Sequence, residues 1–331
     1  MHRFGIAFDI DGVLIRGGKA LPQAAKIIRE LQQRQVPHIF LTNGGGCREE
    51  KKTNTLSQIL GVPLRHEQMI LSHTPMRDLA KKFGDSKVLV LGAYEVMDVA
   101  QHYGFKKVVS VQDLARHSPA QYPFLKWDPT PSPFPDDPIE AIVVLHDPIH
   151  WAQDLQIAVD VLVGGDPLGS GRPDGGKQTP LFVSNDDFTF SGAYPVPRFA
   201  QGAFTRCLQL LYEQHTGKPL EVQRFGKPHA VTYRSVLLSN RSGVHAGSNR
   251  FAEDVMQAQA AGPVERYYGI GDNPYSDIQG ANNAGDHWTS VLVRTGIFTD
   301  TNHAEHPADV VLDAVDDAVQ WILANETTSA R

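Results

Sequence analysis

Near its start the chain reads Gly5-Ile6-Ala7-Phe8-Asp9-Ile10-Asp11-Gly12-Val13-Leu14. The short apolar run predicts a buried strand, and two carboxylates, Asp9 and Asp11, stand where that strand ends. Gly12 follows at once, as a tight turn after a strand requires. Two neighbouring buried acids repel each other unless a cation or a shared proton relieves the repulsion. Taken alone, the pair is equally compatible with two acids that cap a surface turn, so the rest of the chain has to decide.

The composition limits the class of protein. The 331 residues suffice for one large or two medium domains, and 41% hydrophobic with 21% charged residues is ordinary for a soluble globular protein. A net charge of −6 argues against a nucleic-acid-binding surface. Cys47 and Cys207 are the only cysteines, so we expect no disulfide framework and an intracellular protein. No apolar stretch is long enough for a membrane span, and we expect no leader segment because the first residues already belong to a core strand.

Strand-like and helix-like segments alternate in the first part of the chain. The pattern predicts strands at 5–10, 36–41, 69–72 and 88–91 and helices at 22–33, at 49–60 and from residue 75. The same texture returns after about residue 222, with strands at 267–270, 289–293 and 309–312 and a closing helix at 314–323. Strands separated by helices predict a parallel sheet that is covered by helices on both faces.

The middle of the chain differs in texture. The proline-rich residues 128–138 have to form an exposed loop, and a second loop is expected at the glycine-rich residues 164–177. Further strands and one helix are predicted at 142–145, 151–163 and 181–184. We therefore predict an α/β protein with a Rossmann-like, doubly wound core domain at 1–95 plus 223–331. A smaller α/β cap domain at 96–222 is inserted into it.

Four segments, far apart in sequence, each place reactive residues just after a predicted strand. In chain order they carry Asp9 and Asp11, then Thr42 and Asn43, then Lys227, and finally Asp272, Asn273 and Asp277. Such an acidic cluster without histidines favours a hard divalent cation, Mg²⁺. A lysine and a hydroxyl beside that ion suit the oxygens of a phosphoryl group, and a carboxylate can then attack phosphorus as a nucleophile.

These segments resemble, in the same order, the four motifs of the haloacid dehalogenase superfamily, and the resemblance covers nearly the whole chain. The large insert is similar to class IIA, the nitrophenyl-phosphatase-like and pyridoxal-phosphate-phosphatase-like enzymes with a C2-type cap. Its cap signature, Asn-Pro-Asp followed by Gly-Ala, reads Asn185-Asp186-Asp187 and Gly202-Ala203 here. The turn at 42–46 and the segment Leu145-His146-Asp147-Pro148 look closest to the eukaryotic cat eye syndrome critical region proteins. This branch suggests a mitochondrial location; the cytoplasm is the alternative.

The resemblance implies roles for individual residues. Asp9 would attack phosphorus, and Asp11 would protonate the leaving oxygen and later take a proton from the attacking water. Thr42, Asn43 and Lys227 would bind the phosphoryl oxygens. Because dehalogenases of the superfamily lack the second acid, the presence of Asp11 favours hydrolysis of a phosphomonoester.

The resemblance also implies a metal site. Asp9, the backbone carbonyl of Asp11, and Asp272 would hold Mg²⁺, with Asn273 and Asp277 behind them. Asp277 has an open alternative, a charge at a helix N-terminus that interacts with the helix dipole. The glycines at 44–46 either widen the leaving-group site or loosen the loop.

The sequence thus predicts a Mg²⁺-dependent phosphatase that cleaves a small phosphorylated metabolite through an aspartyl-phosphate. Two other functions stay open, a binding or scaffold protein with little turnover and a phosphotransferase. The resemblance further suggests a homodimer formed through the cap. The identity of the substrate lies in cap loops whose contacts the sequence does not reveal.

Overall fold

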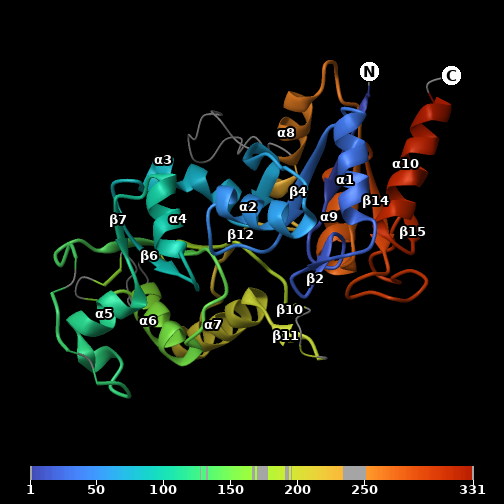
Figure 1. Ribbon diagram of the computed structural model, residues 1–331. Helices are drawn as coiled ribbons and strands as arrows, with labels where there is room; N and C mark the ends of the chain where they lie inside the picture. Colours follow the sequence, from blue (N-terminus) through green and yellow to red (C-terminus); the bar gives the residue numbers. More distant parts are fainter. Residues whose placement is uncertain are drawn as a thin grey trace.

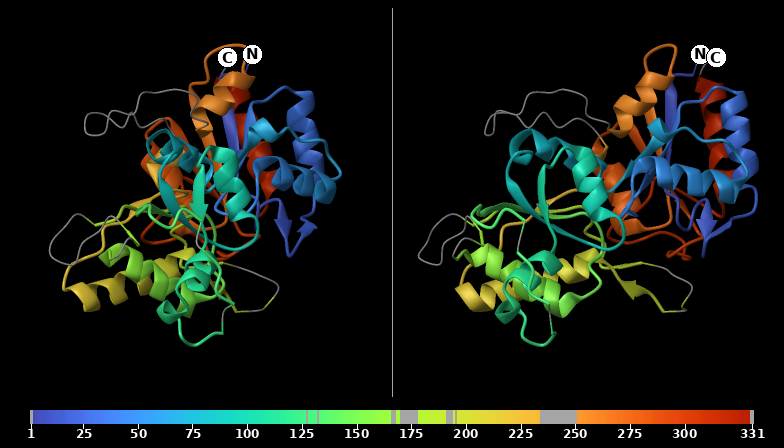
Figure 2. Two further views of the ribbon diagram at one scale, coloured as in Figure 1. Left: turned by 90° about the vertical axis from the view of Figure 1, so that its left-hand side faces the viewer. Right: turned by 60° about the vertical axis from the view of Figure 1, so that its left-hand side comes forward.

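The computed structural model describes residues 2–126, 128–131, 133–165, 168–169, 178–190, 194, 196–233 and 251–329. Within these residues two parallel sheets lie side by side, each with helices packed against it (Figure 1). The two ends of the described chain lie on the same side of the molecule (Figure 2). No helix in the described ranges is both long and apolar enough to cross a membrane.

The first sheet has six strands in the order β15-β14-β13-β1-β4-β5, and all of its pairings are parallel. Its strands are β1 (Phe4–Phe8), β4 (His38–Thr42), β5 (Met69–Leu71), β13 (Arg266–Gly271), β14 (Trp288–Val293) and β15 (Val310–Leu312). The order reverses on either side of β1, which is where open α/β sheets form their ligand crevice. The predicted doubly wound α/β core is therefore confirmed.

The side chains of β1 show why this strand is central. Phe4, Ile6 and Phe8 pack into a core shared with helices α1 (Ala24–Gln33) and α10 (Val315–Ser329). Ala7 faces the opposite core, which is shared with α8 (Ala252–Gln259) and α9 (Gln279–Ala284). Since both faces are covered, the strand is apolar throughout, as parallel strands between helices require.

The second sheet has five parallel strands in the order β12-β9-β8-β6-β7. They are β6 (Lys87–Leu91), β7 (Lys107–Val109), β8 (Ile139–Val144), β9 (Leu181–Val183) and β12 (Gln223–Arg224). The predicted domain boundaries at 95/96 and 222/223 both miss a strand of this sheet, because β6 and β12 fall outside 96–222. The apolar sequence of β6 is typical of any buried strand, so it does not indicate which of the two sheets the strand joins. We propose that the inserted unit runs from β6 to β12.

The remaining helices and hairpins complete these layers. They are α2 (Glu49–Leu60), α3 (Ala80–Phe83), α4 (Val96–Tyr103), α5 (Val111–His117), α6 (Trp151–Val163), α7 (Gln201–Thr216), the hairpins β2 (Ile15–Arg16)–β3 (Lys19–Ala20) and β10 (Thr189–Phe190)–β11 (Arg198–Phe199), and the short helices η1 (His66–Gln68), η2 (Thr74–Leu79), η3 (Pro119–Gln121), η4 (Ala230–Thr232) and η5 (Pro274–Ile278). One face of the second sheet packs on α5, α6 and α7, and the other packs on α3 and α4.

Most predicted elements are present, with small shifts at their ends. The helix expected from residue 75 is a 3₁₀ segment, η2, followed by the four-residue α3. The described residues of 128–138 contain no helix or strand and are almost all exposed, which confirms that loop. Most of the loop expected at 164–177 lies outside the described residues.

A buried polar cluster joins the two units. Glu49, at the start of α2, accepts hydrogen bonds from Thr74 Oγ1 (2.7 Å) and from the hydroxyl of Tyr103 in α4 (2.8 Å). His73 Nδ1 lies 2.8 Å from the same hydroxyl, and Arg77 stacks over the Tyr103 ring. Burial lowers the pKa of His73 to about 4, so the ring is neutral at physiological pH. Hydrogen bonds between buried polar side chains thus connect the inserted unit to the first sheet.

Candidate active site

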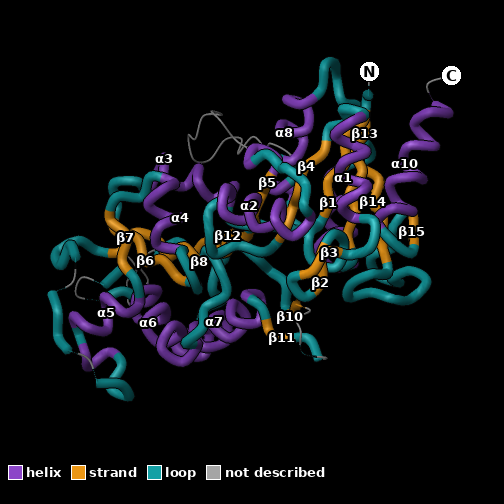
Figure 3. Tube along the Cα trace, in the orientation of Figure 1, coloured by secondary structure: helices purple, strands orange, loops and turns teal. Residues whose placement is uncertain are grey.

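Three neighbouring strands bring the predicted residues together. Figure 3 shows β13, β1 and β4 running side by side, with Phe8 paired to Ile270 on one side and to Phe40 on the other. Asp9 is the first residue after β1, Thr42 is the last of β4, and Asp272 directly follows β13. Because parallel strands end at the same edge, residues separated by more than 200 positions in sequence become neighbours.

Lys227 reaches this edge from the other sheet. It follows the edge strand β12, and its side chain is only 3% exposed. The ammonium group donates to Asp9 Oδ1 (2.5 Å), to Asp277 Oδ1 (2.5 Å) and to the backbone oxygen of Leu41 (3.0 Å). Burial alone would lower the pKa of Lys227, but Asp277 and Asp9 raise it well above its ordinary value. The site therefore holds one permanent cation.

Three buried carboxylates surround that cation. Oxygen atoms of Asp9, Asp272 and Asp277 lie within 4.8 Å of one another. Burial raises the pKa of Asp9 well above its ordinary value, against the opposing charge of Lys227. Burial, with repulsion from Asp277, raises the pKa of Asp272 to about 7. Three acids against one lysine leave the cluster short of positive charge.

Backbone groups hold these acids in place. Asp272 Oδ2 accepts the N–H of Ile297 (2.6 Å), from the loop after β14. Asp277 Oδ2 accepts the N–H groups of Asp272 (3.2 Å) and Asn273 (3.1 Å), while its other oxygen binds Lys227. Asn273 Oδ1 in turn accepts the N–H of Tyr275 (3.0 Å) at the start of η5. Asp277 thus fixes the loop that carries Asp272 and orients the lysine.

Glycine at position 12 is required by a close approach. Its φ is +91°, and a Cβ there would lie 2.5 Å from Asp272 Oδ2. Thr295 Oγ1 also donates to the Gly12 carbonyl oxygen (2.5 Å). The turn after β1 and the loop after β14 therefore close on Asp272 from two sides.

Asn43 connects the first sheet to the loop of Lys227. Its Oδ1 accepts the Lys227 N–H (2.8 Å), and its Nδ2 donates to the Lys227 carbonyl oxygen (2.9 Å) and to Asp187 Oδ2 (3.0 Å). Both polar atoms of the Asn43 side chain are used in this way. The amide therefore positions the loop of Lys227, and the phosphate contact that the resemblance implies for Asn43 stays a prediction. Thr42 Oγ1 accepts the N–H of Gly44 (2.9 Å).

Asp11 differs from the other acids. Its side chain is 60% exposed, and its carboxylate is not a member of the group of three within 4.8 Å. Lys52 Nζ lies 4.0 Å from Asp11 Oδ2. The two early acids, two residues apart, therefore occupy different environments: Asp9 is enclosed, and Asp11 is open to solvent. This separation suits one fixed nucleophile and one group that exchanges protons.

The glycines after Asn43 are packed against the inserted unit. A Cβ on Gly45 would lie 2.8 Å from the His73 ring, and one on Gly46 would lie 2.8 Å from the His146 ring. Gly45 and Gly46 therefore leave room for these two histidines, and the two alternatives that the sequence suggested for the glycines stay predictions.

Two features of the site were not found from the sequence. The loop 294–298, which holds Asp272, follows a predicted strand next to β13, so the strand-end argument could have found it. Lys52 lies in the first turn of α2, and nothing in its sequence context distinguishes it from Lys51.

The residues present fit a divalent cation. Asp9 and Asp272 offer hard carboxylate oxygens at the strand ends, within 4.8 Å of each other, which is the donor type that such an ion prefers. Asp277 has both oxygens engaged and belongs behind these two.

Comparison with known proteins agrees with this geometry. The model of the haloacid dehalogenase-like hydrolases matches residues 6–106, and a HAD-hydrolase-like model matches residues 224–318. A p-nitrophenyl phosphatase from Archaeoglobus fulgidus shares the fold over 96% of this chain and 98% of its own, with a TM-score of 0.63 at 17% identity.

Two fungal proteins are more similar in sequence. A cardiolipin synthase (CMP-forming)/mitochondrial hydrolase fusion protein of Schizosaccharomyces pombe is 36% identical over 98% of this chain, which spans only 54% of that protein's length. A mitochondrial hydrolase of Saccharomyces cerevisiae is 32% identical over 95% of this chain and 94% of its own length. With this end-to-end similarity and two family models on the motif-bearing segments, the chain belongs to the haloacid dehalogenase-like hydrolases.

Proposed function

We propose that the protein is a Mg²⁺-dependent phosphatase that hydrolyses a small phosphomonoester through an aspartyl-phosphate on Asp9. The observation that carries the proposal is the contact of Lys227 with both Asp9 and Asp277, inside a cluster that also holds Asp272. Mg²⁺ together with Lys227 would offset the three carboxylate charges, and both cations would then be available to the oxygens of a dianionic phosphoryl group. The fold shared with a p-nitrophenyl phosphatase supports the same reaction class.

The chain's own residues divide the work. Asp9 is held by Lys227 with one oxygen, which leaves the other to attack phosphorus. Asp11 stands in a solvent-accessible place, where it gives a proton to the leaving oxygen and then takes one from water. Thr42 and Lys227 bind phosphoryl oxygens. Asp9, the Asp11 carbonyl and Asp272 would bind Mg²⁺, and the ion would neutralise charge on the phosphoryl oxygens.

The test is phosphate release from p-nitrophenyl phosphate by the wild type, with Mg²⁺ and with EDTA, beside Asp9→Asn. We expect turnover that needs Mg²⁺ and falls by at least about 10³-fold in the variant, because no other group replaces the nucleophile. Asp154→Asn is the matched control, since Asp154 is a buried carboxylate in α6 of the inserted unit. Equal rates for the wild type and Asp9→Asn would refute the mechanism.

The two alternatives have their own signatures. Stabilisation by Mg²⁺ and inorganic phosphate without turnover on a metabolite panel would indicate a binding protein. Phosphorylated alcohols formed when glycerol or ethanol is added would indicate a phosphotransferase.

We further propose that the protein acts in mitochondria, which is supported by the printed names of both fungal relatives. Fractionation of cells that express the full natural gene tests this. Recovery in the cytosol alone would contradict it. The cat eye syndrome critical region branch and the homodimer through the cap stay predictions.

A further inference from the structure

The first turn of α2 places at the site a cation that the four motifs do not include. Lys52 Nζ lies 4.0 Å from Asp11 Oδ2, which is the outer limit of an ion pair and beyond hydrogen-bond distance. A Cβ on Gly44 would lie 3.5 Å from the same nitrogen, so the ammonium also borders the loop of Thr42. Only 23% of the Lys52 side chain is exposed. Among the described residues, Asp11 is its only ionic partner.

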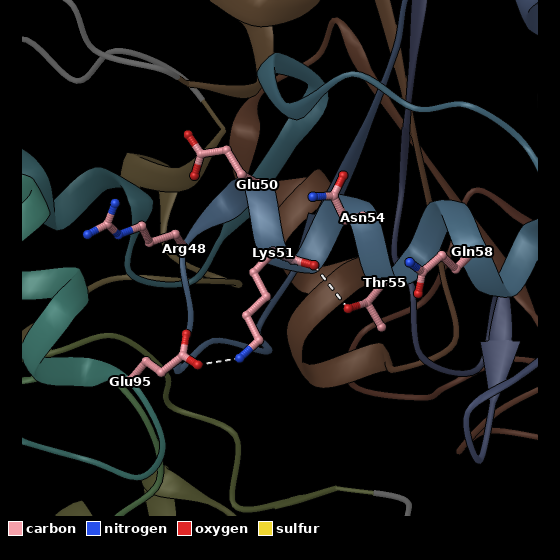
Figure 4. Close-up of a pocket in the computed structure, with 7 residues that line it drawn as sticks. All are labelled: Arg48, Glu50, Lys51, Asn54, Thr55, Gln58 and Glu95. Carbon is pink, nitrogen blue, oxygen red and sulfur yellow. Dashed lines mark hydrogen bonds and ion pairs between the residues drawn. The ribbon is translucent and has the colours of Figure 1, made fainter.

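The preceding residue shows how the protein satisfies an ordinary charge on this helix. Lys51 is 60% exposed, and its ammonium forms an ion pair with Glu95 of the inserted unit. Figure 4 shows this pair. Both residues line an open pocket of about 410 Å³, together with Arg48 and Glu50. Arg48 is likewise paired, to Asp98 at 2.5 Å. Lys52 is more buried than Lys51 and yet lacks such a contact.

The inserted unit contributes a second incompletely satisfied group. His146 packs its ring against Tyr94 and beside Gly46. Its Nδ1 is buried without a hydrogen-bond partner among the described residues, and Asp147 Oδ2 stands 3.5 Å away. Burial lowers the pKa of His146, and the charge of Lys52 lowers it further. The neighbouring Asp147 acts in the opposite direction and raises the pKa of His146.

We propose that Lys52 binds a second anionic group of the substrate, on the leaving-group side of the phosphorus. The inference rests on the proposed function, because it takes Asp11 as the acid beside the leaving oxygen. An ammonium 4.0 Å from that carboxylate lies where it can contact the part of the leaving group that follows the ester oxygen. A partly desolvated ammonium gains a strong charge-assisted hydrogen bond from a carboxylate or a second phosphate. The substrate class is then a small phosphomonoester with a second anion a few atoms from the ester oxygen.

The test compares two esters that differ only in this group. Propyl phosphate and 2-carboxyethyl phosphate are assayed with Mg²⁺ for the wild type, Lys52→Met and Lys51→Met. A charge-assisted hydrogen bond predicts a wild-type preference for the carboxylate ester of about 10- to 100-fold in kcat/KM. Lys52→Met is expected to lower kcat/KM on the carboxylate ester far more than on propyl phosphate, so that the preference is lost. Lys51→Met is expected to keep the preference.

Two outcomes overturn the proposal. The wild type could hydrolyse both esters equally well, or Lys52→Met could lose activity equally on both, in which case Lys52 acts on the phosphoryl group itself. A monoester bearing a second phosphate is the parallel arm that distinguishes the two anion types.

A binding measurement separates this proposal from the proposed function. Butylphosphonate and 4-phosphonobutanoate imitate the two esters and cannot be hydrolysed, so their effect on the melting temperature of the Mg²⁺-loaded protein reports binding alone. Greater stabilisation by 4-phosphonobutanoate in the wild type, lost in Lys52→Met, supports the role of Lys52 even if no ester is turned over. Equal stabilisation by both phosphonates contradicts it even if turnover is seen.

Discussion

Replacing Asp272 by asparagine should stabilise the metal-free protein while it removes the response to Mg²⁺. Burial and Asp277 raise the pKa of Asp272 from 3.8 to about 7. This change corresponds to about 4 kcal/mol of unfavourable free energy for the ionised carboxylate in the folded state. An amide of the same shape carries no such cost and can still accept the N–H of Ile297.

The stability gained by Asp272→Asn depends on pH, because the charge of Asp272 in the wild type does. The pKa of Asp272 is higher in the folded state than in the unfolded state, so the folded state binds more protons between pH 3.8 and about 7. Through Asp272, the wild type therefore loses stability as pH rises through that range. The advantage of Asp272→Asn is thus about 4 kcal/mol at pH 8 and about 2 kcal/mol at pH 5. In Tm these amount to about 6 °C and about 3 °C for a chain of 331 residues.

The assay is thermal unfolding in EDTA and in Mg²⁺ at both pH values. Mg²⁺ should raise the Tm of the wild type at pH 8 and leave that of Asp272→Asn nearly unchanged. Asp154→Asn is the matched control: burial raises the pKa of Asp154 to about 6, so its amide variant should also gain stability but keep the Mg²⁺ response and the turnover. A lower Tm for Asp272→Asn in EDTA at pH 8, or an undiminished Mg²⁺ response, would show that the charge argument is wrong.

Three other substitutions test separate parts of the structure. Lys227→Met leaves Asp9 and Asp277 without their cation, so it should cost about 3–5 kcal/mol in metal-free protein at pH 8; an unchanged Tm would contradict the buried pairing. Gly12→Ala puts a Cβ 2.5 Å from Asp272 Oδ2 at a φ of +91°, so the Mg²⁺ concentration for half-maximal turnover should rise about 10- to 100-fold, and an unaltered requirement would count against this packing. Protonation of neutral His73, with its pKa lowered from 6.5 to about 4, favours unfolding; the wild type should therefore lose about 3 kcal/mol of stability relative to His73→Gln as pH drops from 6.5 to 4, while Asp272 acts in the opposite direction equally in both proteins. Parallel melting curves for that variant and the wild type across this range would exclude the explanation.

Much of the first sheet could be predicted because the hydrophobic pattern of its strands is clear in the sequence. The segments Ile6–Phe8 and Ile39–Leu41 are apolar and buried, which in a parallel sheet means that both faces are covered. Polar residues follow each of these segments directly. Polar side chains at the ends of several buried strands indicate a shared functional site. The positions of Asp9, Thr42 and Asp272 at one sheet edge follow from that pattern and from strand order.

The second sheet was harder to delimit. β6 has the same apolar texture as β1, and only its pairing with β8 shows that it belongs to the inserted unit. β12 is two residues long and too short to give a periodic signal. Boundaries placed on texture alone therefore left out one strand of the sheet at each end.

By itself the sequence determined which residue types are available and that they follow strands, since hydrophobic periodicity and strand-end chemistry are local properties of the chain. Tertiary structure decided how their charges are shared. Lys227 satisfies Asp9 and Asp277 together, Asn43 is used for positioning, and Asp11 stays open to solvent beside Lys52. These assignments depend on burial and on distances of a few ångströms between segments far apart in the chain. Burial and distance fix pKa values and hydrogen-bond partners, and neither is encoded in the spacing of a single motif.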